Sequence, residues 1–322
     1  MKLDVSLITP VYNEEENLQL LYEAVVKTMQ PLGLAWELIL VDDGSKDRSV
    51  EILEGLSVSD PDHIRVVAFR RNFGQTAAIA AGIDHSTGDV VVLLDADMQN
   101  DPADIPMMLG KIREGYDVVS GWRYHRQDAF LARTLPSRMA NGLISAVTGV
   151  HLHDYGCTLK AYRREVITGF KLYGEMHRFI PVYAHSVGAK IIEVRVNHHA
   201  RRFGKTKYGL ERTLKVILDL ITVKFLSSYS NKPIYLFGGT GAVLMGLGTL
   251  VLFYLFIRRV FFAISVLGSP LFISSLMIFV LGFQSVLMGL IAELLVRTYH
   301  ESQNKPIYTI RKTLNLPMKS DE

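Results

Sequence analysis

The stretch Val90-Val91-Val92-Leu93-Leu94-Asp95-Ala96-Asp97-Met98-Gln99 decides the fold of this chain. Its first five residues are apolar and three of them are β-branched, which is typical of a short strand buried on both faces of a sheet. In open α/β sheets the ligand crevice lies at the carboxyl ends of the strands. Asp95 and Asp97 follow that end. Because residues two apart in an extended chain point the same way, they can present oxygens to one cation.

Oxygen ligands of this kind suit Mg²⁺ or Mn²⁺, ions that usually also hold substrate phosphates. An ordinary acidic loop after a strand is the alternative. Other features of a phosphate-binding site along the chain decide between the two interpretations.

Short apolar runs alternate with helical segments around this stretch. Helices are predicted over about 15–30, after Asp47, over 75–85 and from 102 to about 114, with Asn13 and Asp47 as N-caps. Strands are predicted at 5–8, 37–41, 64–69, 90–94 and 117–121, with two more at 158–162 and 190–196. This alternation with short turns predicts an α/β fold, a mostly parallel sheet with helices on both faces.

Composition excludes several classes of protein. The chain has 322 residues, a formal net charge of +3 and a single cysteine, Cys157. A charge so close to zero does not indicate a nucleic-acid-binding protein. One cysteine excludes an internal disulfide and is typical of a reducing compartment. Residues 1–4 show no signal-peptide pattern, so we expect any membrane insertion to depend on interior segments.

Two interior segments, 234–257 and 267–292, contain no charged side chain. About 20 apolar residues are enough for a helix to span the hydrocarbon core, so these segments predict a transmembrane hairpin. Eight Lys or Arg residues lie in 201–232 and five after residue 296, but only two in the linker 258–266. The positive-inside rule therefore predicts that the catalytic domain and both termini are cytoplasmic.

The predicted organisation has four parts. A cytoplasmic α/β domain covers 1–208, with amphipathic interfacial helices at about 129–147. An amphipathic juxtamembrane helix covers 209–232, and the transmembrane hairpin covers 233–296. A basic tail covers 297–322.

Four loops that follow predicted strands, 9–14, 42–45, 72–82 and 95–97, should meet at one edge of the sheet. The first two offer donors and acceptors for a base and ribose, and the last offers a metal site for a diphosphate. Gly74, Ala78 and Gly82 share one helix face. Small residues there favour either backbone approach to a ligand or tight packing of the helix on the sheet.

These loops, with Gly121-Trp122-Arg123, Asp154-Tyr155-Gly156-Cys157 and the run Arg202 to Tyr208, resemble the family-2 glycosyltransferases with a GT-A fold. Within that family the chain looks like the polyprenyl-phosphate glycosyltransferases, the dolichol-phosphate mannose synthase-like group, and most like its bacterial GtrB-type undecaprenyl-phosphate glucosyltransferases. The resemblance covers nearly all of 3–230, and the two-span layout matches the GtrB type. A Rossmann dehydrogenase is disfavoured, because no Gly-x-Gly-x-x-Gly follows the first strand.

The resemblance implies roles for individual residues. Mg²⁺ or Mn²⁺ would be surrounded by Asp95, Asp97 and Gln99. The nucleotide sugar would be bound by Pro10, Tyr12, Glu14, Asp42, Asp43, Gly74, Ala78, Asp95 and Ala96. The lipid phosphate would be bound by Arg123, Arg138, Arg202 and Lys205, since an arginine fork can bond a phosphate bidentately.

Asp97, Asp154 and Arg123 are the expected catalytic residues. Asp154 is either a base, a sugar-positioning residue or a turn-forming aspartate before Tyr155-Gly156. We interpret Cys157 as a packing residue rather than a nucleophile.

The function implied is metal-dependent, inverting transfer of one sugar to undecaprenyl phosphate at the cytoplasmic face of a bacterial-type plasma membrane. UDP-glucose is the expected donor, with GDP-mannose or a UDP-4-amino-arabinose derivative as alternatives. A processive polysaccharide synthase is less favoured, because no Gln-x-x-Arg-Trp motif occurs. The intact Asp95-Ala96-Asp97 argues against a non-catalytic adaptor. Glycines in the first span permit close helix packing, so a homo-oligomer, a tetramer as in GtrB-type relatives, is expected.

Overall fold

The structure is a computed structural model. It describes residues 3–124, 141–168 except 143 and 147, 172, 176–200, 234–262, 265, 269–302 and 309–316. The chain forms two compact units. The first comprises Met1–Val223 with Pro306–Glu322, and the second comprises Lys224–Lys305.

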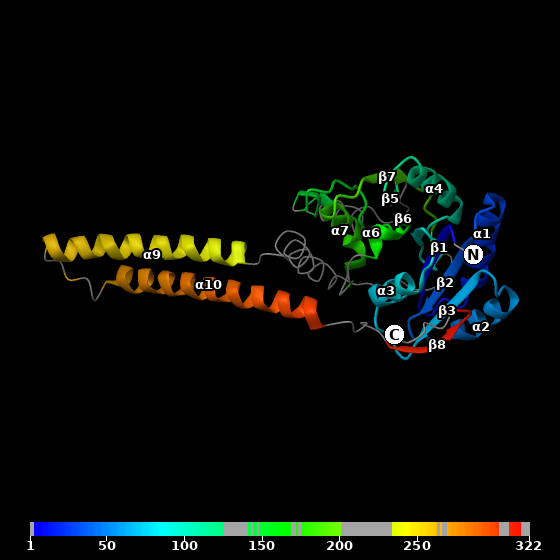
Figure 1. Ribbon diagram of the computed structural model, residues 1–322, viewed down its shortest axis with the longest axis horizontal. Coiled ribbons are helices and arrows are strands. Elements are labelled where there is room, and N and C mark those ends of the chain that lie inside the picture. The colour runs from blue at the N-terminus through cyan, green and yellow to red at the C-terminus, as the bar shows by residue number, and fades with distance from the viewer. Residues whose placement is uncertain are drawn as a thin grey trace. The chain divides into compact units, whose positions relative to one another are not determined.

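The first unit contains a mixed sheet whose described strands have the order β7-β5-β6-β4-β1-β2-β3-β8 (Figure 1). In chain order the strands are β1 (Val5–Val11), β2 (Trp36–Asp42), β3 (Ile64–Phe69), β4 (Val90–Leu93), β5 (Val118–Trp122), β6 (Lys160–Arg163), β7 (Ile191–Arg195) and β8 (Ile310–Leu314). Strand β6 runs antiparallel to β4 and β5, and β8 runs antiparallel to β3. The remaining pairs are parallel.

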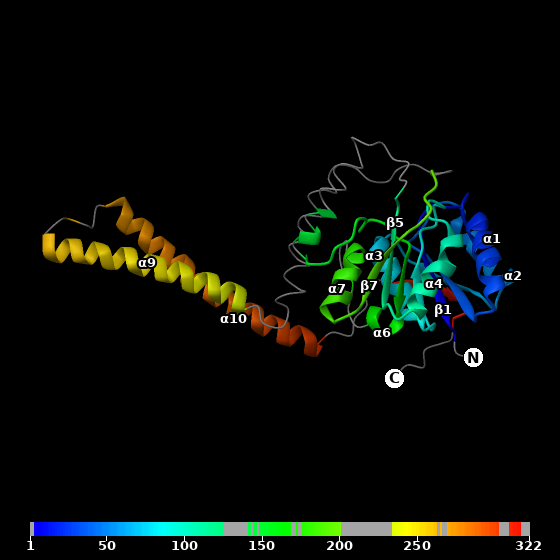
Figure 2. The same cartoon turned by 90° about the horizontal axis from the view of Figure 1, so that it is seen from above.

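Helices cover both faces of this sheet, as Figure 2 shows. One layer holds α1 (Leu18–Met29), α2 (Ser49–Ser59) and α4 (Ile105–Arg113). It also holds the short 3₁₀ helices η1 (Gln30–Leu32) and η2 (Pro102–Asp104). The other holds α3 (Gln75–His85), α6 (Arg164–Ile167) and α7 (Ile180–Ser186), with η4 (Met176–Phe179). Every residue of β2 is buried, as expected for a central strand covered on both sides.

The predicted α/β class, the mostly parallel sheet and the predicted strands are confirmed. Asp47 accepts a hydrogen bond from the N–H of Ser49, the first residue of α2, at 3.0 Å. The prediction that Asn13 caps the first helix is wrong, because α1 begins only at Leu18. Asn13 has φ +52°, and its side-chain oxygen accepts from the N–H of Lys46 at 2.8 Å. The side chain of Asn13 therefore connects two loops and does not cap a helix.

Strand β8 lies in what the sequence analysis treats only as a basic tail. It extends the sheet beyond β3, with Leu314 opposite Val66 and Lys312 opposite Ala68. The next residue, Asn315, donates from Nδ2 to the carbonyls of Ser57 and Ile64. The C-terminal segment is thus an edge strand of the first unit (Figure 1).

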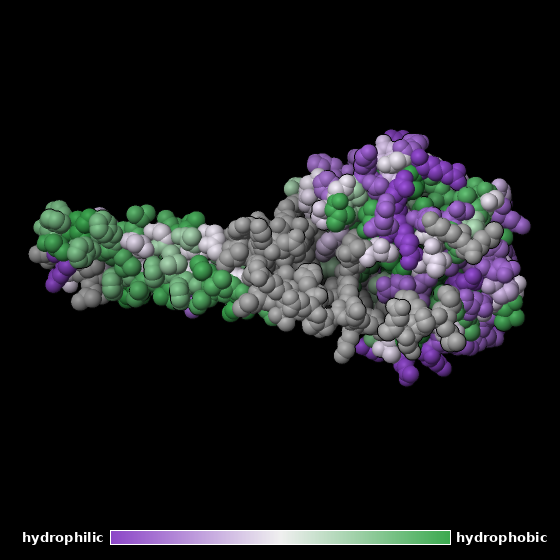
Figure 3. All heavy atoms as spheres, in the orientation of Figure 1, coloured by the Kyte–Doolittle hydropathy of each residue, from purple (hydrophilic) through white to green (hydrophobic). Residues whose placement is uncertain are grey.

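The second unit contains two long helices, α9 (Ile234–Phe262) and α10 (Pro270–Ser302), which pack against each other. The segments Phe237–Phe262 and Pro270–Ala292 have a mean hydropathy of 2.1 and are long enough to cross a membrane. Hydrophobic side chains cover their visible surface in Figure 3, and many of these side chains are exposed. Exposed apolar surface of this extent is typical of a membrane or interaction surface.

Candidate active site

Asp95 and Asp97 follow β4 at the carboxyl edge of the sheet; we call these two residues the acidic corner. Gln75, the first residue of α3, donates from Nε2 to Asp95 Oδ1 at 2.9 Å. Asp97 Oδ1 accepts from the N–H of Gln99 at 3.1 Å. Burial and the nearby charge of Asp97 raise the pKa of Asp95 to about 6. The two carboxylates are therefore near enough to repel each other.

A divalent cation would relieve this repulsion, and two hard carboxylates fit Mg²⁺ or Mn²⁺. Within the described part of the chain, no three His, Cys, Asp or Glu side chains gather to hold a metal ion. An ion at the acidic corner would therefore need further oxygens from a diphosphate or from water, which is common for Mg²⁺. The carbonyl of Gln99 accepts from the N–H of His199 at 2.9 Å, so this loop is fastened to the segment after β7.

A buried ion pair between Arg123 and Asp154 lies beside the acidic corner. Arg123 donates from Nε and Nη2 to the two carboxylate oxygens at 2.7 and 2.9 Å. Burial opposes its charge, but the hydrogen bonds and charge of Asp154 raise the pKa of Arg123 above its ordinary value. Asp154 Oδ1 also accepts from the N–H of Gly156 at 3.1 Å, which is the expected turn. These bonds favour a positioning role for Asp154 over that of a base.

Lys160, which lies in β6 and is buried, is not among the residues predicted for the site. Its ammonium donates to the carbonyls of Tyr155 and Cys157, and burial lowers its pKa. It thereby fixes the loop that carries Asp154. A lysine at the centre of the predicted strand 158–162 was the available signal. Cys157 is fully buried and burial raises the pKa of its thiol to about 11, which agrees with a packing role.

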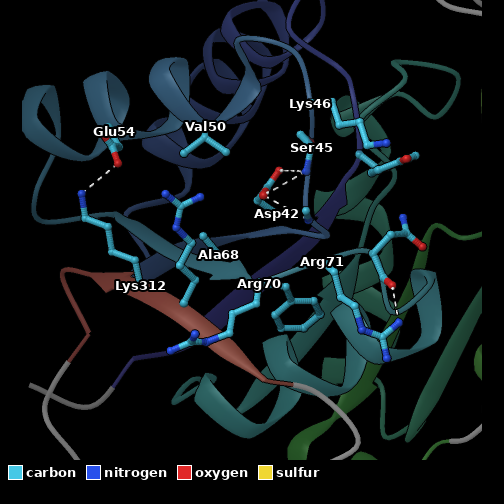
Figure 4. Close-up of a pocket in the computed structure, with 14 residues that line it drawn as sticks. Asp42, Ser45, Lys46, Val50, Glu54, Ala68, Arg70, Arg71 and Lys312 are labelled. Carbon is cyan, nitrogen blue, oxygen red and sulfur yellow. Dashed lines mark hydrogen bonds and ion pairs between the residues drawn. The ribbon is translucent and has the colours of Figure 1, made fainter.

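A cavity of about 640 Å³ opens at the ends of β2 and β3 (Figure 4). Two of the residues predicted to bind the nucleotide, Tyr12 and Asp42, line it together. Five exposed cations that the sequence analysis did not assign to a ligand also line it: Lys46, Arg70, Arg71, Arg311 and Lys312. We call it the cationic cavity. Arg70 and Arg71 directly precede the third predicted loop, and this position in the sequence could have indicated that they lie at the site.

Two aspartates at the end of β2, Asp42 and Asp43, hold the loops around this cavity. Asp42 accepts from the N–H groups of Gly44 and Ser45, at 3.1 and 3.2 Å, in a tight turn. Asp43 accepts from the N–H groups of Phe73 and Gly74, at 2.6 and 2.9 Å. Burial raises the pKa of Asp43 to about 6. Asp43 therefore ties the loop that leads to Gln75, and so to Asp95, onto the end of β2.

Gly44 stands where no side chain fits. Its φ is +71°, and a Cβ atom there would lie 2.5 Å from the carbonyl carbon of Arg71. The turn after β2 is therefore pressed against the backbone that follows β3.

Tight packing explains Gly82, because a Cβ there would collide with the Ile8 side chain of β1. Ala78 and Ala96 are buried, so any contact of theirs with a ligand would come from the backbone. Gly74 has φ +97° at the start of α3.

Seven of the nine residues predicted to bind the nucleotide sugar do not line the cationic cavity, and Pro10 and Glu14 are two of them. Pro10 pairs with Val41 inside the sheet. Glu14 accepts from Nδ2 of Asn17 at 2.8 Å. Arg138, Arg202 and Lys205, predicted to bind the lipid phosphate, lie outside the described residues.

Comparisons with known proteins agree with this geometry. The glycosyl transferase family 2 model matches residues 6–170. Dodecaprenyl-phosphate galacturonate synthase of Rhizobium johnstonii is 41% identical over 96% of this chain and 93% of that protein. Undecaprenyl-phosphate 4-deoxy-4-formamido-L-arabinose transferase of Proteus mirabilis is 37% identical over 99% of this chain and 97% of that protein.

The fold is also similar to a solved structure, glucosyl-3-phosphoglycerate synthase from Mycobacterium tuberculosis in complex with Mn²⁺, UDP and phosphoglyceric acid. The TM-score is 0.53 at 20% identity, over 70% of this chain and 78% of that chain. With the acidic corner at the carboxyl edge of a mostly parallel sheet, this chain belongs to glycosyl transferase family 2 and is a glycosyltransferase with a GT-A-like fold.

Proposed function

We propose that this protein transfers a single sugar from a nucleotide sugar to a polyprenyl phosphate. The observation that carries the proposal is the combination of the acidic corner with two long, exposed apolar helices in one chain. A metal-assisted donor site suits a nucleoside diphosphate, and a membrane hairpin suits a lipid acceptor. The two relatives named above, which match nearly the whole length of the chain, are named for sugar transfer to prenyl phosphates.

The acidic corner would hold the donor diphosphate through Mg²⁺ or Mn²⁺, with Asp95, Asp97 and Gln99 around the ion. The ion would stabilise the charge that builds on the departing nucleoside diphosphate. Arg123 adds a fixed positive charge close to Asp95, and Asp154 keeps its guanidinium in one orientation. The base and ribose would occupy the cationic cavity beside Tyr12 and Asp42.

The acceptor needs little activation. A phosphate oxygen is already anionic near neutral pH, so a strong general base is unnecessary. This agrees with an Asp154 that is already bonded to Arg123. Attack on the anomeric carbon from the side opposite the diphosphate would invert its configuration. Arg138, Arg202 and Lys205 remain the proposed contacts of the lipid phosphate.

The donor sugar is the point at which the comparisons favour an alternative. We expected UDP-glucose, but the relatives are named for galacturonate and for 4-deoxy-4-formamido-L-arabinose. A UDP-4-amino-arabinose derivative, one of our alternatives, fits those names better than glucose does. We therefore propose a UDP-linked sugar of this modified kind as the donor.

The proposed location is the cytoplasmic face of a plasma membrane. Because β8 belongs to the same sheet as β1, the segments before and after the apolar hairpin would lie on one side of a membrane that the hairpin crosses. That supports an even number of crossings, and the basic flanks favour the cytoplasmic side.

A homo-oligomer remains a proposal. Gly241 and Gly282 face each other inside the hairpin, whereas a Cβ at Gly239 or Gly246 would meet nothing within 4 Å. Another helix could approach closely at those two positions.

One assay tests the function. The purified full-length protein is incubated with undecaprenyl phosphate and a panel of labelled UDP- and GDP-sugars, with and without a chelator. We expect a lipid-linked monosaccharide from a modified UDP-sugar, lost with the chelator and restored by Mg²⁺ or Mn²⁺. Formation of a polymer would instead favour a processive synthase, and no transfer from any donor would favour an adaptor.

A further inference from the structure

Strand β8 contributes two cations, Arg311 and Lys312, to the cationic cavity. Arg311 and Lys312 of β8 line the same cavity as Tyr12 and Asp42, which lie at the other end of the chain (Figure 4). They reach it because β8 pairs with β3, whose carboxyl end carries Arg70. The cavity wall thus combines Tyr12, which directly follows the first strand, with two residues of β8.

Strand β8 is fixed in this position by several contacts. Besides the ladder with β3, Lys312 forms an ion pair with Glu54 of α2 at 2.8 Å. The N–H of Arg70 donates to the carbonyl of Thr309 at 3.2 Å. At the far end, Asn315 donates to two backbone carbonyls of the first unit. The side chain of Arg311 is therefore presented at a defined place beside the cavity.

The charges around the cavity do not balance. Two acids line the cavity. Glu54 forms an ion pair with Lys312, and Asp42 accepts hydrogen bonds from the backbone N–H groups of Gly44 and Ser45. In the described part of the chain, the side chains of Arg70 and Arg311 take part in no hydrogen bond or ion pair. Two such arginines favour an anionic ligand with a flat group, because a guanidinium can stack on a base or bond a phosphate bidentately.

We propose that Arg311 is a nucleotide-binding residue, so that donor binding depends on the strand that follows the second apolar helix. The ligand is a nucleoside diphosphate, the part of a nucleotide sugar common to every donor considered above. The proposal deepens the proposed function, on which it rests for the identity of this ligand. Lys312 has a different role, since its ammonium is engaged with Glu54 and holds β8 against α2.

The test measures binding of UDP to the purified full-length protein in detergent by isothermal titration calorimetry. Arg311→Ala should weaken binding about tenfold, the usual order for one charge-assisted contact. Thr313→Ala is the matched control, because Thr313 is exposed on the same strand and does not line the cavity. The affinity of Thr313→Ala for UDP should equal that of the wild type. Both Arg311→Ala and Thr313→Ala should keep the wild-type melting temperature.

Arg311→Gln keeps the aliphatic stem and should show the same loss, which separates lost charge from a disturbed strand. Wild-type affinity for UDP in both Arg311 variants would overturn the inference. Intact nucleotide binding that is sensitive to Arg311, without transfer to polyprenyl phosphate, would support it and overturn the proposed function. Failure of the wild type to bind either UDP or GDP would overturn both.

Discussion

The acidic corner and the cationic cavity lie at the same edge of one sheet but are built in opposite ways. At the acidic corner, Asp95 is held by Gln75, and the neighbouring Arg123 is held by Asp154. In the cationic cavity, Arg70 and Arg311 are exposed, and among the described residues their side chains form no hydrogen bond or ion pair. The side chains proposed for the chemical step are therefore held in position by other side chains before a ligand binds. The positive charges of the cavity would be balanced only by a bound anion.

The largest effect should follow a break in the acidic corner. Asp97→Ala should lower turnover about 1,000-fold or more, because a catalytic ion supplies several kcal/mol of charge stabilisation. The measurement is the initial rate with saturating donor and Mg²⁺, and the melting temperature should stay near that of the wild type. Asp62→Ala, at an exposed acid just before the amino end of β3 and so at the end of that strand away from the site, should have wild-type turnover. Unchanged turnover in Asp97→Ala would show that Asp97 does not bind a catalytic ion.

The second effect concerns the ion pair beside the corner. Asp154→Ala should lower the free energy of unfolding by about 3–5 kcal/mol, because it leaves the buried Arg123 charge unpaired. Turnover should fall with it. The double variant Arg123→Ala with Asp154→Ala should cost less than the sum of the single variants, as measured by denaturant unfolding. If Asp154→Asn abolished turnover without any loss of stability, Asp154 would have to be a base after all.

The third effect concerns Asp43, which connects the two regions. Its pKa is raised to about 6, from an ordinary value of 3.8. Between these values the folded protein keeps a proton that the unfolded chain has lost. Stability contributed by Asp43 is therefore present below pH 4 and is lost as the pH rises to about 6.

Thermal unfolding of the wild type and Asp43→Asn across this range measures the effect. The melting temperature of the wild type should fall relative to that of the variant as the pH rises from 4 to 6.5. Parallel profiles of the two proteins would contradict the raised pKa.

The smallest effect concerns the wall of the cavity. Gly44→Ala should cost about 2 kcal/mol of stability and weaken UDP binding, because the residue has a positive φ and a Cβ atom would press on Arg71. Gly55→Ala is the matched control, since Gly55 lies in α2 with open space around it. It should be neutral or stabilising by about 0.5–1 kcal/mol. Equal effects of the two variants would show that the close approach of the two loops is unimportant.

Local signals in the sequence predicted most of the fold and the acidic corner. Buried apolar runs such as Val90–Leu93 define strands, and Asp95 and Asp97 follow one of them directly. The prediction for Asn13 failed because its side chain bonds to Lys46, in a loop 33 residues away. The sequence does not distinguish the two interpretations of Gly82, because its contact with Ile8 joins residues 74 positions apart.

The pocket wall supplied by β8 could not be predicted in this way. The sequence Ile310-Arg311-Lys312-Thr313-Leu314 is a short, mostly exposed edge strand with little apolar signal. Its pairing with β3 joins parts of the chain that no local pattern connects. Its two cations were counted only as charges that orient a membrane hairpin.

The position of β8 in the chain has a consequence for the order of biosynthesis. The ribosome makes residues 310–314 only after both apolar helices, α9 and α10, have been made. A nascent chain therefore cannot close the cationic cavity until its hairpin has left the ribosome and is ready to enter the membrane. If Arg311 binds the nucleotide as proposed, full affinity for the donor is reached only after the hairpin has been made.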